Sequence, residues 1–229
     1  PLSYLKSELE PDKRSEKLIT MKKNTCFQPH VGKDYTTGGI FGKRIMVLGE
    51  SHYCDEKCKD CGLFAEHRSC TKFTNNVIND YLNEDKKRER WMNTFLKFER
   101  SLVDHKTDWS ERKEIWQSIL FYNYLQVAMT GPRKPGSNLQ YAQATSSFYE
   151  VIDTYKPQYI VAWGKRLWNY LPGDVRWHWD IPIKIEGFNV LRGFYTLNNG
   201  DKAMIISVYH PSGGYSWDWW FKVIREFLK

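Results

Sequence analysis

A cluster of cysteines has the spacing of a metal site. The stretch over residues 46–70 reads MVLGESHYCDEKCKDCGLFAEHRSC, and it holds four of the five cysteines of the chain, Cys54, Cys58, Cys61 and Cys70. Four thiolates on one short loop suit tetrahedral zinc, which can fold a loop that lacks its own core. An iron–sulfur cluster is the alternative metal, and disulfides or metal-free thiols are the other possibilities. His52 and His67 are spare ligands, whereas Cys26 is too remote in sequence to assign.

The cysteines follow one of several apolar runs that predict the strands of a sheet. Such runs cover residues 43–49, 158–164 and 203–210, and a helical pattern over 115–126 runs into another. Strands that alternate with helices indicate an α/β sheet, largely parallel, with helices on both faces. We predict a three-layer α/β/α fold with a central, mainly parallel four-stranded sheet, plus an additional β-hairpin and the Cys-rich loop. Ligands of such sheets bind past the carboxyl ends of the strands.

Helical spacing and turn residues predict the remaining elements. An apolar stripe typical of a helix is formed by Trp91, Phe95, Phe98 and Leu102. Residues 146–157 read as a second helix, and Ser216 is placed to cap a strongly amphipathic last helix. Residues 181–209 look β-rich, with an Asn199-Gly200 turn suited to a hairpin. We expect residues 1–35 to be a polar, flexible arm and residues 36–229 to form one domain, with the Cys-rich loop at 54–70.

The composition favours a soluble protein with a polyanionic partner. The net charge is +7 and the pI is near 9.0, so the electrostatic field attracts nucleic acid first and anionic membranes second. No apolar run reaches the roughly 20 residues of a membrane span, and the first residues contain no secretory signal. Clustered cysteines fit a metal site in a reducing compartment. We therefore expect a cytoplasmic monomer that binds DNA and no membrane.

Four short motifs, in order and each at the end of a predicted strand, carry a family resemblance. They are Gly49-Glu50 with Tyr53, then Asn123, then Trp163-Gly164, then His210-Pro211-Ser212. In this respect residues 43–229 resemble the uracil-DNA glycosylase superfamily. Its first motif is of type Gly-Gln-Asp-Pro-Tyr or Gly-Glu-Ala-Pro-Gly, and its last is a His-Pro-Ser loop that leads into a helix.

The resemblance implies a role for each residue in cleaving an N-glycosidic bond in DNA. Glu50 and His210 would be catalytic, with the histidine stabilising the charge that develops on the departing base. The base, extruded from the stack, would be held by His52, Tyr53, Phe64 and Asn123. An asparagine amide suits a pyrimidine edge because it offers one acceptor and two donors. Phosphates would be held by Arg133, Lys134, Ser212 and Gly213.

The sequence departs from the family pattern in the first and last motifs. Ser51 stands where the best-known branch has its water-activating Asp, and His52 replaces a proline. Glu50 is the nearest carboxylate and fits the Gly-Glu-Ala-Pro-Gly branch better. Gly213-Gly214 follow Ser212 in place of the usual proline. Besides a monofunctional glycosylase for uracil or another damaged base, two functions stay open: a non-catalytic nucleic-acid-binding module on the same fold, and a nucleoside- or nucleotide-processing enzyme.

Overall fold

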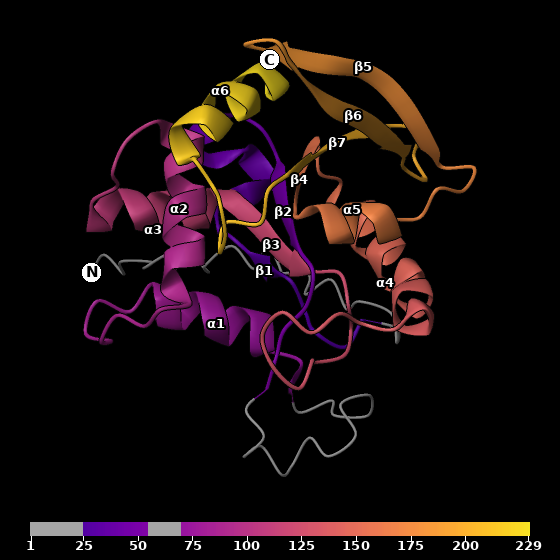
Figure 1. Cartoon of the computed structure of the whole chain (residues 1–229). Coiled ribbons are helices and arrows are strands. Elements are labelled where there is room, and N and C mark those ends of the chain that lie inside the picture. Colours follow the sequence, from indigo (N-terminus) through magenta and orange to yellow (C-terminus); the bar gives the residue numbers. More distant parts are fainter. Residues whose placement is uncertain (1–24, 55–69) are drawn as a thin grey trace, which may run out of the picture.

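The structure, a computed structural model, describes residues 25–54 and 70–229 (Figure 1). The strands are β1 (His30–Val31), β2 (Ile45–Gly49), β3 (Ile119–Asn123), β4 (Tyr159–Trp163), β5 (Trp177–Ile185), β6 (Phe188–Thr196) and β7 (Lys202–Val208). The α-helices are α1 (Phe73–Tyr81), α2 (Met92–Val103), α3 (Trp109–Ser118), α4 (Asn138–Tyr155), α5 (Lys165–Tyr170) and α6 (Trp217–Phe227). Two 3-10 turns, η1 (Tyr35–Thr37) and η2 (Gly39–Phe41), precede β2.

The strands form one mixed sheet of seven strands in the order β1-β3-β2-β4-β7-β6-β5. The strands β3, β2, β4 and β7 run parallel, whereas β1, β6 and β5 pair antiparallel with their neighbours. The α/β class was predicted, but the four-stranded sheet with a separate hairpin was not correct in detail. The β5–β6 hairpin joins the sheet because β6 pairs with β7, and β1 adds a strand at the other edge.

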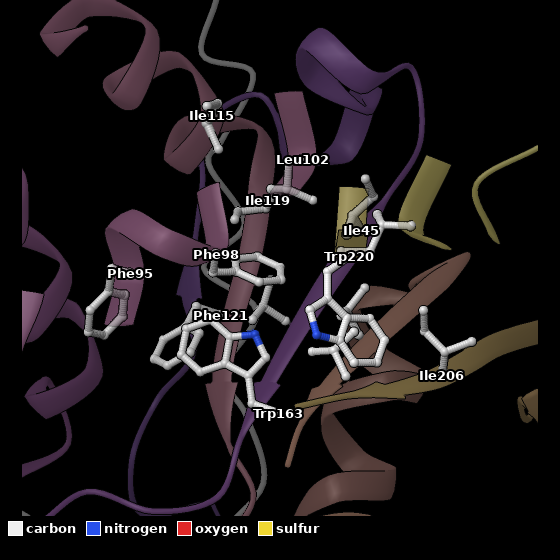
Figure 2. Packing of buried hydrophobic residues seen from close by; sticks show 14 of the residues in the cluster. Ile45, Phe95, Phe98, Leu102, Ile115, Ile119, Phe121, Trp163, Ile206 and Trp220 are labelled. Carbon is white, nitrogen blue, oxygen red and sulfur yellow. The ribbon is translucent and has the colours of Figure 1, made fainter. Parts of the chain in front are cut away.

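Alternate residues of the parallel strands point into two apolar cores on opposite faces of the sheet. Ile45 and Val47 face a core with α1, α2, α3 and α6, whereas Met46 and Leu48 face a core with α4 and α5. Figure 1 shows α2, α3 and α6 to the left of and above the sheet and α4 and α5 to its right. Figure 2 shows the first core, in which Phe98 and Phe121 surround the Trp163 ring. Such strands, covered on both faces, need continuous apolar runs.

The predicted helices are present, and two differ in their ends. The helical pattern before β3 ends at Ser118, where the chain enters the strand directly. Helix α4 begins eight residues before the predicted start, because Ser137 and Gln140 form a reciprocal capping box. Ser216 does occupy the N-cap of α6, but its hydroxyl donates to Asp218 and caps no backbone N–H.

Two tight turns shape the antiparallel part of the sheet. The Asn199-Gly200 turn joins β6 to β7 as predicted, and Gly200 has a φ of 86°. A second hairpin, between β5 and β6, turns at Glu186 and Gly187 with φ of 49° and 83°. Two consecutive positive φ values suit the right-handed twist of the flanking strands.

Residues 25–35 are packed on the sheet, although the sequence predicted a flexible arm up to residue 35. β1 pairs with β3, and the fully buried Tyr35 donates to the carbonyl of Tyr155. Phe27 is also buried. Residues 25–35 contain few apolar residues, and these are spaced irregularly among polar ones. The sequence therefore shows no helical or strand periodicity here, and only the fold reveals what the segment packs against.

Among the helices of the described ranges, none has the length and apolar character that a membrane span requires.

Candidate functional site

A cleft of about 1430 Å³ lies at the carboxyl ends of the parallel strands. Its lining includes Gly49 and Asn123, the last residues of β2 and β3, and Trp163, the last of β4. The predicted site residues that line this strand-end cleft are Glu50, His52, Tyr53, Asn123, Arg133, Lys134, His210 and Ser212. The carboxyl edge of a parallel sheet gathers side chains that are remote in sequence.

Four other predicted residues are Gly213, which the structure describes, and Phe64, Cys58 and Cys61, which it does not. Gly213 does not line the cleft, although its N–H donates to the His210 carbonyl at 3.1 Å and it belongs to the same turn. Phe64, Cys58 and Cys61 lie outside the described residues. The role of Phe64 as a base-stacking ring therefore stays a prediction.

The chain segment after β2 runs alongside the segment after β3, and backbone hydrogen bonds hold the two together at the cleft. Backbone N–H groups of Tyr124 and Leu125 donate to the carbonyls of Gly49 and Glu50, both at 2.9 Å. A side chain at Gly49 would displace Asn123, because a Cβ there would lie 2.1 Å from Oδ1 of Asn123. The 5% exposed Asn123 thus lies against the backbone of the first motif.

His52 is a buried partner of Asn123. Its Nε2 lies 2.9 Å from the Thr74 hydroxyl, and the Asn123 amide nitrogen lies 3.1 Å from both ring nitrogens. In the neutral ring one nitrogen donates and the other accepts, so the ring can accept from the amide N–H and bond to the Thr74 hydroxyl at the same time. The ring stacks on Phe73 at 4.4 Å and meets the edge of Phe27 at 5.1 Å. Burial among these rings lowers the pKa of His52 to about 3, so the ring is neutral at pH 7.

Both carboxylate oxygens of Glu50 are bound by neighbouring side chains. Arg166 donates to them through Nε at 2.6 Å and Nη2 at 2.7 Å, and the Tyr141 hydroxyl donates to Oε1. The Tyr141 ring stacks on Tyr170 with centroids 3.9 Å apart, and burial together with the Glu50 bond raises the Tyr141 pKa. Sequence analysis missed Arg166, although it comes two residues after the Trp163-Gly164 motif.

His210 presents a ring N–H to the cleft. Its Nδ1 accepts from the Ser212 N–H at 3.2 Å and lies 2.8 Å from the Ser212 hydroxyl, so the proton of the neutral ring is on Nε2. Although His210 is exposed at the cleft mouth, desolvation of its ring lowers its pKa; Arg166 adds to this and Glu50 opposes it. Gly164, whose φ of 99° favours glycine, would place a Cβ 3.5 Å from the Cβ of His210.

The rim of the cleft is basic. Seven cationic and three carboxylate side chains line it. Lys86 pairs with Asp80 at 2.6 Å and with Glu89 at 3.5 Å, and Arg166 pairs with Glu50. Of the seven cationic side chains that line the cleft, five have no carboxylate partner within the described part of the chain: Arg90, Lys97, Arg133, Lys134 and Lys165. These charges suit phosphate groups.

The predicted metal ligands are only partly described. Cys54 and Cys70 flank residues 55–69, and the backbone N–H of Cys54 donates to the Met129 carbonyl at 3.0 Å. The pKa of the Cys26 thiol is raised mainly by burial and, to a smaller extent, by the nearby Cys70 thiol. No group of three or more potential ligands is gathered within residues 25–54 and 70–229. The zinc site therefore stays a prediction.

No family model matches the sequence, and no curated protein matches it.

Proposed function

We propose that the chain is a DNA glycosylase-like hydrolase that removes uracil or another damaged base by base flipping. The observation that supports this most is that Glu50, Asn123 and His210, which follow or end three parallel strands, line one cleft with a basic rim. The family resemblance of their motifs points the same way. We further propose DNA as the partner and a cytoplasmic monomer as the acting form.

The chemistry assigns His210 the main electrostatic role. When the bond between the sugar C1′ and the base nitrogen breaks, the electron pair leaves with the base; the oxygen of water adds to C1′ and its proton goes to solvent, from which the base anion takes up a proton. The Nε2–H of His210 can donate a hydrogen bond to the base oxygen on which the charge develops. Removing one such donor costs about 10²- to 10³-fold in rate, or roughly 3–4 kcal/mol.

Asn123 would contact the edge of the extruded base, with its amide orientation fixed by His52. Its Nδ2 is bonded to the neutral His52 ring, so one amide hydrogen and the carbonyl oxygen remain for a ligand. Tyr53 lines the cleft beside them. A buried amide with a fixed orientation discriminates between bases because a mismatched edge leaves a polar group unpaired.

Glu50 acts in this proposal as a positioning residue. The sequence suggested a carboxylate that orients water, but Arg166 and Tyr141 occupy both oxygens. The ion pair instead holds Arg166 against the loop of Arg133, whose carbonyl accepts from Arg166 Nη1 at 3.4 Å. Rate enhancement would then depend on His210 and on the extrusion of the base.

The test is a base-release panel with uracil, hypoxanthine, xanthine and oxidised pyrimidines in oligonucleotides. The parent is expected to release at least one base, and His210→Ala to do so about 10²- to 10³-fold more slowly. His178→Ala is the matched control, because His178 is exposed on β5 and outside the cleft. Equal activity of the His210→Ala variant and the parent would show that the catalytic assignment is wrong.

One observation favours the non-catalytic binding module as a second candidate. All three carboxylates that line the described cleft are paired with cations. Glu50, the one that belongs to the first motif, has both oxygens bound by side chains, which favours a role other than orienting water. Intact bases after long incubation, with DNA binding retained, would favour this module. A nucleoside-processing enzyme would instead show little salt dependence in any DNA binding.

The proposal also includes a structural metal, bound by the four clustered cysteines. We propose zinc on Cys54, Cys58, Cys61 and Cys70, with an iron–sulfur cluster as the alternative. Metal analysis of protein purified without chelator tests this, and four reactive thiols without bound metal would contradict it.

A further inference from the structure

Two exposed tyrosines lie inside the strand-end cleft. Most large apolar side chains that are exposed in the described part of the chain lie outside it, but Tyr53 and Tyr209, 45% and 47% exposed, line it. Tyr53 follows the end of β2, and Tyr209 follows the end of β7. β4 lies between these two strands, and Tyr53 comes four residues after β2, beside Met129, whereas Tyr209 directly follows β7, so the two rings stand on separate segments of the cleft lining. Each ring can therefore stack on a different base.

Cations line the cleft on both sides of these rings. On one side, Arg90 comes two residues before α2 and Lys97 lies on the second turn of that helix, with Asn93 and Thr94 between them. All four line the cleft, together with the aromatic Trp91 and Phe95 of the same segment. The two cations and the two polar side chains of this wall suit phosphate oxygens.

On the other side, the cations come from the loop before α4 and from the start of α5. Arg133 and Lys134 lie in that loop, and Lys165 begins α5. The Lys165 ammonium lies 5.0 Å from the centroid of the Tyr209 ring. A cation beside a stacking ring is the combination that lets one nucleotide be held by its base and its phosphate together.

We propose that the cleft binds DNA as a single strand several nucleotides long, with bases stacked on Tyr53 and Tyr209 and phosphates on the two cationic walls. This inference rests on the proposed function and names the form of its substrate. In a duplex only an extruded base has a free face, so two exposed rings in one cleft could both be stacked on only if two bases were extruded, whereas the bases of a single strand are accessible to both. The cleft also exceeds the roughly 300–1,000 Å³ of a typical small-ligand pocket.

The test measures binding without any chemistry. A lesion-free, fluorescein-labelled DNA of about 12 nucleotides is titrated by anisotropy as a single strand and as a duplex. We expect the single strand to bind more tightly. Tyr53→Ala and Tyr209→Ala should each weaken it about 5- to 100-fold, since stacking is worth roughly 1–3 kcal/mol per base, whereas Tyr209→Phe should retain affinity.

Matched controls separate the cleft from the rest of the surface. Trp179→Ala removes a 62% exposed ring on β5, outside the cleft, and should leave the affinity unchanged. Lys97→Ala should lower the slope of log K against log salt by about 0.7, as loss of one single-strand phosphate contact requires. Lys184→Ala, on β5, should leave the slope as it is.

The outcomes distinguish this inference from the proposed function. Duplex binding at least as tight as single-strand binding, or full affinity of both tyrosine-to-alanine variants, would overturn the single-strand inference even if bases are released. Tyrosine-dependent binding of the single strand supports it even if no base is released, in which case the glycosylase proposal alone fails. Tighter binding of an oligouridylate RNA of the same length would overturn the commitment to DNA.

Discussion

Replacing His52 with glutamine is expected to make the fold less sensitive to acid. The His52 pKa is about 3 in the folded protein and 6.5 when unperturbed, because the ring is buried beside Phe27 and Phe73. Between these values the unfolded chain binds the proton and the folded chain does not. Stability from this residue is therefore complete above about pH 6.5 and is lost as the pH falls toward 3.

The size of the effect follows from the two pKa values. Between about pH 7.5 and pH 5, protonation of His52 in the unfolded chain lowers the free energy of unfolding by about 2 kcal/mol. His52→Gln keeps an amide that can bond to Thr74 and Asn123 but cannot titrate. The variant should therefore lose about 2 kcal/mol less than the parent over this range. The buried His30, whose pKa is also lowered, contributes equally to both proteins and cancels in the difference.

The assay is urea denaturation of both proteins at the two pH values, with the free energy of unfolding extrapolated to water. His105→Gln is the control, because the hydrogen bond that His105 donates to Glu111 raises the pKa of the exposed His105, which has the opposite sign. The His105→Gln variant should therefore lose at least as much free energy of unfolding as the parent between the two pH values. Equal losses in the parent and in His52→Gln would refute the assignment of a buried, neutral imidazole at this position.

Three further substitutions test the site and the core. Glu50→Gln should lower the pKa of His210 further, because Glu50 raises it, and an NMR titration showing an unchanged or higher pKa would contradict this. Gly49→Ala should cost about 1–3 kcal/mol in thermal unfolding, since the new Cβ would lie 2.1 Å from Asn123 Oδ1; an unchanged melting temperature speaks against that contact. Glu99→Gln removes a fully buried charge that pairs with Arg112 at 3.1 Å. It should lower the free energy of unfolding by about 3–5 kcal/mol in guanidinium denaturation, and a loss under 1 kcal/mol would contradict this.

The strands of the parallel part of the sheet could be predicted because each is an unbroken apolar run. Burial on both faces demands such runs, and each ends where the chain leaves the sheet, as at Gly49 and Gly164. The sheet edges could not be predicted in the same way. The two-residue β1 is too short for a pattern. The residues of β5 do alternate, with apolar side chains at positions 177, 179, 181, 183 and 185, but alternation does not tell which strand is the neighbour.

The candidate site could be predicted as a set of positions but not as a set of interactions. The resemblance of motifs at the ends of apolar runs pointed to Glu50, Asn123 and His210, and all three line the cleft. Arg166, which binds Glu50, is 116 residues away from it in sequence. The chain has 34 lysines and arginines, and nothing in the residues around Arg166 distinguishes it from the others as the partner. The burial of His52 against Asn123 likewise joins residues 71 apart.

The sequence by itself determined where strands and helices form and which polar residues stand at the strand ends, because periodicity and turn chemistry act over a few neighbouring residues. The tertiary structure alone decided the chemical state of those residues. Whether a carboxylate such as Glu50 is paired, and whether a histidine such as His52 is desolvated, depends on atoms that arrive from distant parts of the chain. Electrostatic interactions and solvation act over a few ångströms in space, irrespective of separation along the chain.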